Sequence, residues 1–172
     1  MLKAAGMCLI LAGTTGIGNS MARELDQRTA QIQELQRLTL LLQGEIRCVR
    51  QPLPDAFRRL GEEANEPFSD FFRETARELE SRSGATASGI WERNVRRIRG
   101  RLRLSAGELK ELEELGSMLG YLDVTMQLET LRYYERRLEA ALAQAKETAD
   151  SRRRLYRYLG ALGGAAIVLL LL

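Results

Sequence analysis

The segment Leu115-Gly-Ser-Met-Leu-Gly-Tyr-Leu-Asp-Val-Thr-Met-Gln127 places glycines and an acidic residue between two runs of apolar residues. Glycine adopts backbone conformations that other residues avoid and commonly follows the last residue of a helix, so Gly120 predicts a helix end. Asp123 predicts the start of the next helix, because its carboxylate can accept hydrogen bonds from the free amides of the first turn. The segment therefore predicts a corner between two helices.

The rest of the pattern L-G-x-x-L-G-x-x-D-x-x-x-Q fits the same corner. Gly116 allows a neighbouring helix to approach closely, and Leu119 is the last apolar position before the turn. Gln127 lies one turn after Asp123 and faces the same side of its helix. We interpret the whole pattern as a structural corner and not as an active site.

Helices are predicted on both sides of this corner. Upstream, Ser105 and Glu108 form a capping box, in which each side chain bonds the other residue's backbone amide, and a fifth helix begins there. Its apolar positions are Leu109, Leu112, Leu115 and Leu119. Downstream, a sixth helix continues toward the C-terminus and would be about 70 Å long if unbroken. Its apolar positions are Val124, Leu128, Leu131, Leu138, Leu142, Ala145 and Ala149.

Four more helices are predicted earlier in the chain. The first covers Arg23–Val49, follows the N-terminal apolar stretch without a turn residue, and is stopped by Pro52 and Pro54. Its apolar stripe is Ile32, Leu35, Leu38, Leu42, Ile46 and Val49. The second carries Leu53, Phe57 and Leu60 and is followed by a turn over Gly61–Pro67. The third carries Phe68, Phe71, Phe72, Thr75 and Leu79, and the fourth carries Ile90, Trp91, Val95 and Ile98.

The fold predicted from these elements is all-α. Ser81–Thr86 reads as a loop by composition, Trp91 is expected to anchor the core, and no stretch alternates as a β-strand does. We expect a compact bundle of about six helices. Its first and last helices are long, run antiparallel and continue into membrane anchors.

Both ends of the chain are apolar and almost uncharged, which predicts a membrane anchor at 1–22, a cytoplasmic helical bundle domain at 23–155 and a second anchor at 156–172. As helices, the uncharged stretches rise about 28 Å and about 22 Å, against a bilayer core of roughly 30 Å. Lys and Arg are concentrated on the inner side of each stretch, which places the middle of the chain in the cytoplasm. Gly160 and Gly164 form a G-x-x-x-G pair suited to helix packing in lipid.

Each end also has an alternative interpretation. The N-terminal stretch resembles a cleaved signal peptide, with Ser20-Met-Ala22 as the cleavage site. The C-terminal stretch could be a buried core helix, but it is apolar on all faces over its last residues, which favours an anchor.

Composition excludes several kinds of chemistry. The 172 residues contain no histidine, which rules out His-based triads, His metal sites and His proton shuttles. Cys8 and Cys48 are the only cysteines, so neither a disulfide framework nor a zinc site is expected. Aromatic residues make up 6%, which is few for base stacking, and the net charge of +3 does not by itself indicate nucleic-acid binding.

Carboxylates occur in pairs, such as Glu62-Glu63 and Glu113-Glu114. They lie between the apolar stripe positions, which is typical of solvated helix faces and not of an enclosed acid–base centre. We therefore expect no catalytic residues and no enzyme activity.

A basic segment, Arg93–Arg103, is the remaining candidate surface. Its arginines are Arg93, Arg96, Arg97, Arg99, Arg101 and Arg103. A solvated face paired with the acidic Glu108–Glu114 stretch is the favoured interpretation. An acidic protein partner leads the functional alternatives, ahead of anionic lipid and nucleic acid.

Several features together resemble the stage III sporulation protein AB family of endospore-forming bacteria, over essentially the whole chain. The most specific is the pattern of Leu115–Gln127, and the basic segment is more basic than the family would lead us to expect. The other features are the Met-Leu-Lys start, Leu-Leu-Gln-Gly-Glu-Ile46, Pro52-Leu-Pro-Asp-Ala56, Phe71-Phe72, Ile90-Trp91 and the Leu-rich tail.

The resemblance implies a membrane protein of the mother cell, located at the membrane around the forespore. It implies a bundle similar to the cytoplasmic domain of the type II secretion system F protein, within a secretion-like complex of other stage III sporulation A proteins. There it would be a non-enzymatic platform that docks a cytoplasmic ATPase, stage III sporulation protein AA. No cofactor, metal or nucleic acid is implied, and whether the chain forms a homo-oligomer is left open.

Two other functional classes stay open. A secreted or periplasmic helical binding protein would have a mature N-terminus near Arg23. A peripheral lipid-binding protein would use the basic segment on anionic headgroups and would be released by salt.

Overall fold

The computed structural model describes residues 2–49, 52–81, 84–119 and 123–171. All regular secondary structure within these residues is helical. Side chains are described for 23–47, 52–81, 84–119 and 123–152. The chain divides into two compact units, Met1–Thr29 with Ala143–Leu172, and Ala30–Leu142. Each unit is considered by itself.

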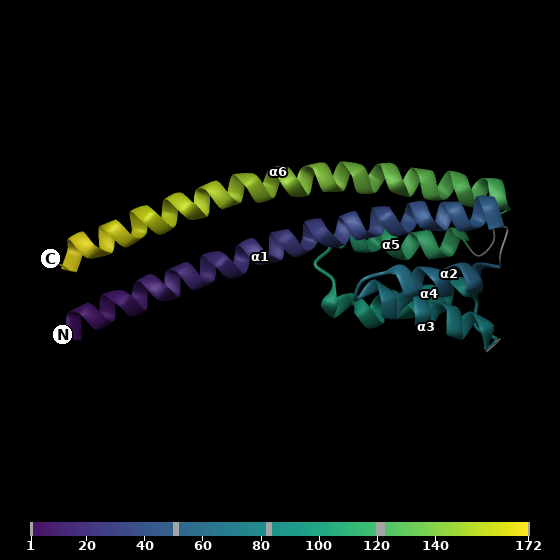
Figure 1. The fold of residues 1–172 in the computed structure, drawn as a ribbon, viewed down its shortest axis with the longest axis horizontal. Helices are drawn as coiled ribbons and strands as arrows, with labels where there is room; N and C mark the ends of the chain where they lie inside the picture. The colour runs from purple at the N-terminus through teal and green to yellow at the C-terminus, as the bar shows by residue number, and fades with distance from the viewer. Residues whose placement is uncertain (1, 50–51, 82–83, 120–122, 172) are drawn as a thin grey trace. The chain divides into compact units, whose positions relative to one another are not determined.

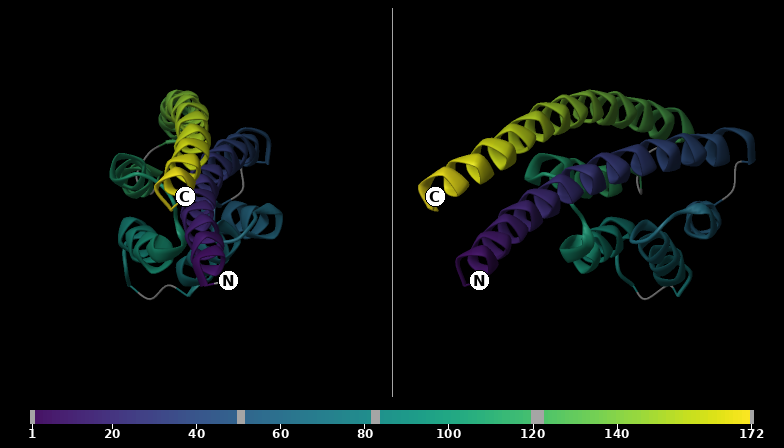
Figure 2. Two further views of the ribbon diagram at one scale, coloured as in Figure 1. Left: turned by 90° about the vertical axis from the view of Figure 1, so that its left-hand side faces the viewer. Right: turned by 60° about the vertical axis from the view of Figure 1, so that its left-hand side comes forward.

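The first unit consists of the two chain ends. Helix α1 covers Leu2–Gly44 and helix α6 covers Val124–Leu171, so both helices run without interruption into the apolar ends. This confirms the prediction that the first and last helices continue into these stretches. The N- and C-termini lie at the same end of the unit (Figures 1 and 2). The predicted packing of Gly160 and Gly164 lies outside the side chains that the structure describes.

Among the residues searched, which are those that the structure describes, no helix is both long enough and apolar enough to cross a membrane.

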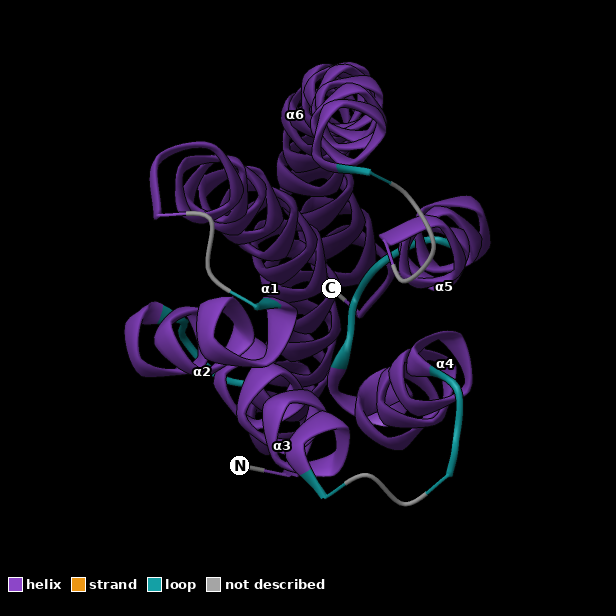
Figure 3. Ribbon diagram, turned by 90° about the vertical axis from the view of Figure 1, so that its right-hand side faces the viewer, coloured by secondary structure: helices purple, strands orange, loops and turns teal. Residues whose placement is uncertain are grey.

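The second unit contains the bundle. After α1, a π-helical turn covers Glu45–Val49, and the short helices are α2 (Leu53–Glu63), α3 (Phe68–Glu80), α4 (Ala87–Ile98) and α5 (Ala106–Leu119). A 3₁₀ turn, Arg99–Arg101, follows α4. Seen end-on in Figure 3, the helices follow one another in chain order around a ring, and α6 returns between α5 and α1. The Gln43 amide of α1 donates to Glu135 Oε2 of the antiparallel α6 at 3.0 Å.

The core is formed by the predicted apolar stripes. Ile32 of α1 and Leu131 of α6 are completely buried. The side chains one and two turns further along each helix face are at most 4% exposed; they are Leu35, Leu38, Tyr134 and Leu138. An aromatic cluster fills the space between α2, α3 and α4, where the rings of Phe71 and Trp91 meet edge to face with centroids 4.7 Å apart. Phe57 lies 5.5 Å from the same indole ring. Such tilted and edge-to-face pairs are the favoured arrangement of aromatic rings.

Two predicted details were wrong. The turn expected to begin at Gly61 begins after Glu63, and Gly61 is instead a point of close approach between α2 and α3. A Cβ on Gly61 would lie 2.6 Å from Arg73 Cγ and 2.9 Å from the Arg73 backbone nitrogen. Val124 was expected on the buried stripe of α6 but is exposed, whereas Tyr134 occupies a buried position.

Polar side chains on α1 hold the connections between the shorter helices. Glu34 accepts hydrogen bonds from the Arg37 guanidinium, at 2.8 and 3.0 Å, and from the backbone amide of Asn65 at 2.8 Å. Arg37 also donates to the carbonyl of Glu63 at 2.7 Å, so the C-terminal end of α2 is fastened to α1. Gln31 bonds the chain after α4 in both directions, since its amide donates to Arg101 O and its oxygen accepts from Arg103 N.

The Glu34 contacts predict a dependence of stability on pH. Hydrogen bonds from Arg37 hold the pKa of the Glu34 carboxyl below its usual value. A carboxyl with a lowered folded-state pKa stabilises the fold above its unfolded-state pKa, about 4.3, and this contribution is lost as the pH falls through the folded-state value. We expect Glu34→Gln to lower stability at pH 7 and to make the acid-side decline shallower, as measured by thermal unfolding from pH 7 to pH 3. Glu62→Gln, at an exposed position, is the control, and parallel curves for wild type and Glu34→Gln would contradict the prediction.

Candidate functional site

The helix cap that the sequence predicts at Asp123 is present at the start of α6. The Asp123 carboxylate accepts from the backbone amide of Met126 at 3.0 Å, and the Asp123 carbonyl accepts from the amide of Gln127 at 2.9 Å. Asp123 therefore caps the first turn of α6. Gly120 lies outside the residues that the structure describes.

Gln127 has a role at the corner that its spacing from Asp123 does not reveal. Its side-chain amide donates to the carbonyl of Leu119 at 2.8 Å. The carbonyls in the last turn of a helix have no partner within the helix, so this bond satisfies one of them at the end of α5. The side chain of Leu119 is itself buried.

Gly116 is the position where α5 meets α4. A Cβ built on Gly116 would lie 2.0 Å from Cγ and Cδ1 of Trp91, which leaves no space for a side chain. Trp91 is only 2% exposed, and its indole N–H donates to the carbonyl of Leu112 at 2.7 Å. The interpretations of Gly116 as a site of close helix approach and of Trp91 as a core anchor are both confirmed.

The capping box at the start of α5 is also confirmed. The Ser105 amide donates to Glu108 Oε2 at 2.6 Å, and the Glu108 amide donates to Ser105 Oγ at 3.3 Å. Polar contacts therefore stabilise both ends of α5: the capping box at its start and the bond from Gln127 at its end. Trp91 packs against its buried face.

We expect Gly116→Ala to destabilise the protein by about 1–3 kcal/mol or more, because the added methyl group needs space that the indole ring of Trp91 occupies. Gly107→Ala is a matched control on the same helix, since no atom lies within 4 Å of the added carbon. The control should change the free energy of unfolding by less than about 1 kcal/mol, because Gly107 lies in the first turn of α5, where helix propensity has a smaller effect than in the interior. Urea unfolding measures both changes. Equal free energies of unfolding for the two variants would contradict the prediction, because the contact with Trp91 would then not restrict the size of residue 116.

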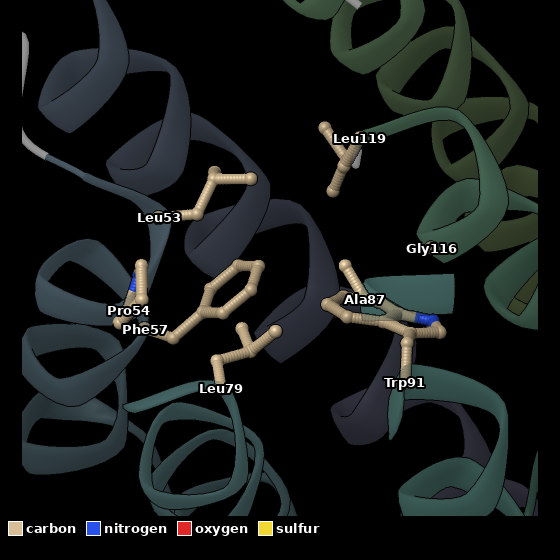
Figure 4. Close-up of a pocket in the computed structure, with 8 residues that line it drawn as sticks. All are labelled: Leu53, Pro54, Phe57, Leu79, Ala87, Trp91, Gly116 and Leu119. Carbon is tan, nitrogen blue, oxygen red and sulfur yellow. The ribbon is translucent and has the colours of Figure 1, made fainter. Parts of the chain in front are cut away.

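A small apolar cavity of about 180 Å³ lies beside Trp91 and the corner (Figure 4). Helices α2, α3, α4 and α5 contribute its walls, which are formed by Leu53, Pro54, Phe57, Leu79, Ala87, Trp91, Gly116 and Leu119. It is smaller than the 300–1,000 Å³ typical of small-molecule sites. None of these lining residues has an acidic or basic side chain, so acid–base catalysis has no candidate here.

The basic segment faces α3. Arg93 pairs with Glu78, Arg97 Nη1 lies 3.2 Å from Glu74 Oε1, and Arg101 Nη1 lies within 3.1 Å of both Glu66 and Asp70. These side chains form a row of ion pairs along the outside of α3 and α4. The sequence predicted that these arginines pair with acidic residues of Glu108–Glu114. This prediction was wrong for Arg93, Arg97 and Arg101, because their acidic partners lie on α3 or just before it.

The other arginines differ in their surroundings. Arg96 pairs with Glu92 one turn earlier on α4, at 3.3 Å. Arg99 is exposed on the 3₁₀ turn. Contacts from Arg77 and Arg97 lower the pKa of Glu74, and contact from Arg101 lowers that of Asp70, so both carboxyls are stabilised as anions. Four arginines of the segment, Arg93, Arg96, Arg97 and Arg101, therefore have acidic partners within the same unit.

We expect the double charge reversal Arg96→Glu, Arg97→Glu to leave the fold intact. Exposed ion pairs contribute about 0–1 kcal/mol each, and a like-charge pair one turn apart on a helix costs only a few tenths more. Far-UV circular dichroism and the melting temperature test this expectation. A protein that no longer folds would mean that the row of ion pairs is essential to the bundle.

Within the residues that were searched, no group of three or more Asp, Glu or Cys side chains is placed to hold a metal ion. Hydrogen bonds from arginine side chains are the main cause of the lowered pKa values of Glu34, Asp70 and Glu74. Burial raises the pKa of the Tyr134 phenol, which therefore stays protonated.

Comparison with known proteins gives a consistent result. The family model for stage III sporulation protein AB matches residues 3–172. The chain belongs to the stage III sporulation protein AB family. Stage III sporulation protein AB of Bacillus subtilis (strain 168) is 28% identical over 172 residues, which is 100% of both chains. A solved structure of stage III sporulation protein AB is similar with a TM-score of 0.66 and 26% identity, covering 72% of this chain and 97% of that chain.

This family membership confirms the resemblance seen in the sequence and implies a role in stage III of sporulation. It also covers the corner, the aromatic cluster and both chain ends, because the match extends from residue 3 to residue 172.

The sequence analysis missed one surface. Met118 and Tyr133 are large, exposed and close to the corner, but neither lies on an apolar stripe.

Proposed function

We propose that the chain is a non-enzymatic, membrane-anchored component of a sporulation complex between mother cell and forespore. The bundle serves as a platform that docks a cytoplasmic secretion-type ATPase, stage III sporulation protein AA. The other stage III sporulation A-complex proteins and the membrane are its further partners. The observation that carries this proposal is the full-length family match, over residues 3–172.

The chemistry of the described residues supports a docking role over an enzymatic one. The apolar cavity has no titratable lining, and the perturbed carboxyls are partners of arginine in ion pairs on the surface. Nucleic acid is not proposed as a partner, because carboxylates of α3 already pair with much of the basic segment.

Membrane attachment through residues 1–22 and 156–172 is part of the proposal. Its support is the pair of nearly uncharged ends and the concentration of Lys and Arg on their inner sides. The bundle then faces the mother-cell cytoplasm.

The test uses the full chain in lipid nanodiscs, titrated with purified ATPase from the same organism, with and without nucleotide. We expect saturable binding measured by biolayer interferometry. The intact mass of the membrane-extracted protein should include residues 1–22. Absence of binding by folded protein would refute the platform role, and a mature N-terminus near Arg23 would instead favour the secreted binding protein.

A further inference from the structure

The leucines of α1 would allow this helix to pack in the bundle in more than one register. Four buried positions along its stripe hold Ile32, Leu35, Leu38 and Thr39. If α1 slipped by three residues, the same positions would hold Leu35, Leu38, Leu41 and Leu42. Residues three apart lie on one face of a helix, so the slip needs only a small rotation. Burial of these apolar positions therefore does not by itself determine the register of α1.

Polar side chains of α1 bind backbone groups of the short helices over the same stretch. Gln31 bonds the chain after α4 as donor and as acceptor, at 3.1 and 2.6 Å. Glu34 accepts from a backbone amide between α2 and α3 at 2.8 Å, and Arg37 donates to the last carbonyl of α2 at 2.7 Å. These three residues lie within two turns of α1, and their partners are main-chain groups whose positions the short helices determine.

A slip by three residues would mismatch all three contacts. Glu34 would take the place of Gln31, and a carboxylate cannot donate to the carbonyl after α4. Arg37 would take the place of Glu34, and a guanidinium cannot accept from an amide. Leu40 would take the place of Arg37 and has no donor. The three polar residues therefore match one register only.

Glu45 opposes the same slip from the other end of the stripe. After the slip it would take the place of Leu42, which is only 2% exposed, and burial of an unpaired carboxylate is unfavourable. In the structure Glu45 Oε2 instead lies 3.4 Å from Arg59 Nη1 of α2. A test of the other three residues must therefore remove this carboxylate as well.

We propose that Gln31, Glu34 and Arg37 form a register lock, which selects the axial position of α1 against the short helices. Polar side chains at apolar helix interfaces specify register in coiled coils for the same reason. A slip by three residues corresponds to about 4.5 Å along α1. Because α1 is one helix over Leu2–Gly44, the lock also determines how many of its residues precede the bundle. This inference does not depend on the proposed docking role.

The experiment measures the distance between spin labels on α1 and α3 by double electron–electron resonance, with the full chain in detergent solution. The labels replace the exposed Gln33 and Glu80 in a Cys8→Ser, Cys48→Ser background. Helix α3 begins near the Glu34 contact and has 13 residues, so Glu80 lies at its far end. A slip of α1 therefore lengthens this distance, by up to about 4.5 Å.

The register variant is Gln31→Ala, Glu34→Ala, Arg37→Ala, Glu45→Leu, and the matched control is Glu45→Leu alone. Both variants lack the carboxylate that opposes the slip, and they differ only in the register lock. We expect a second, longer distance in the register variant and the single wild-type distance in the control. Labels at Glu62 and Glu80, on α2 and α3, should give one unchanged distance in every variant.

A conservative variant separates register from stability. Glu34→Gln, Glu45→Leu keeps an acceptor oxygen at position 34, so we expect a single distance even though its melting temperature falls. Circular dichroism verifies the fold of each variant. If the register variant does not fold, Gln31→Ala, Arg37→Ala, Glu45→Leu takes its place, since these two side chains lose only exposed hydrogen bonds.

Two results would overturn the inference. A single, wild-type distance in the folded variant without the lock would show that apolar packing alone sets the register. Two distances in the Glu45→Leu control would show that the lock does not select between the registers.

Discussion

The bundle depends on the contact between the indole ring of Trp91 and the backbone of α5. The ring lies flush against Gly116, where a Cβ would approach within 2.0 Å, and its N–H bonds the carbonyl of Leu112. The same ring meets Phe71 edge to face and approaches Phe57, so one side chain joins α2, α3, α4 and α5. Burial of so much aromatic surface at one point makes the other helices adjust to it.

Around this contact, polar side chains fix the ends of helices. Gln127 bonds the last turn of α5, Glu34 and Arg37 hold the end of α2, and Gln31 holds the chain after α4. Each of these bonds satisfies backbone groups that a helix or turn leaves free. The short helices are thereby tied to the two long ones, α1 and α6, which form the framework of the bundle.

The α3–α4 side and the α5–α6 side of the bundle differ in charge pairing and in exposed apolar side chains. Arginines on the α3–α4 side pair with carboxylates of the same unit, whereas Met118 and Tyr133 on the α5–α6 side are exposed. The first side presents ion pairs, and the second presents exposed apolar side chains.

Local signals in the sequence determined the helices, the capping box at Ser105 and the cap at Asp123, because each depends on residues within one or two turns of one another. Short motifs along the chain were enough to indicate the family. Only the tertiary structure decided the partners of the basic segment and the bond from Gln127 to Leu119. Each joins residues whose distance depends on how the helices pack, and helical periodicity gives the face of a side chain but not the neighbour across from it. Gly61 shows the same limit, since its role as a contact with Arg73 exists only once α2 and α3 have met.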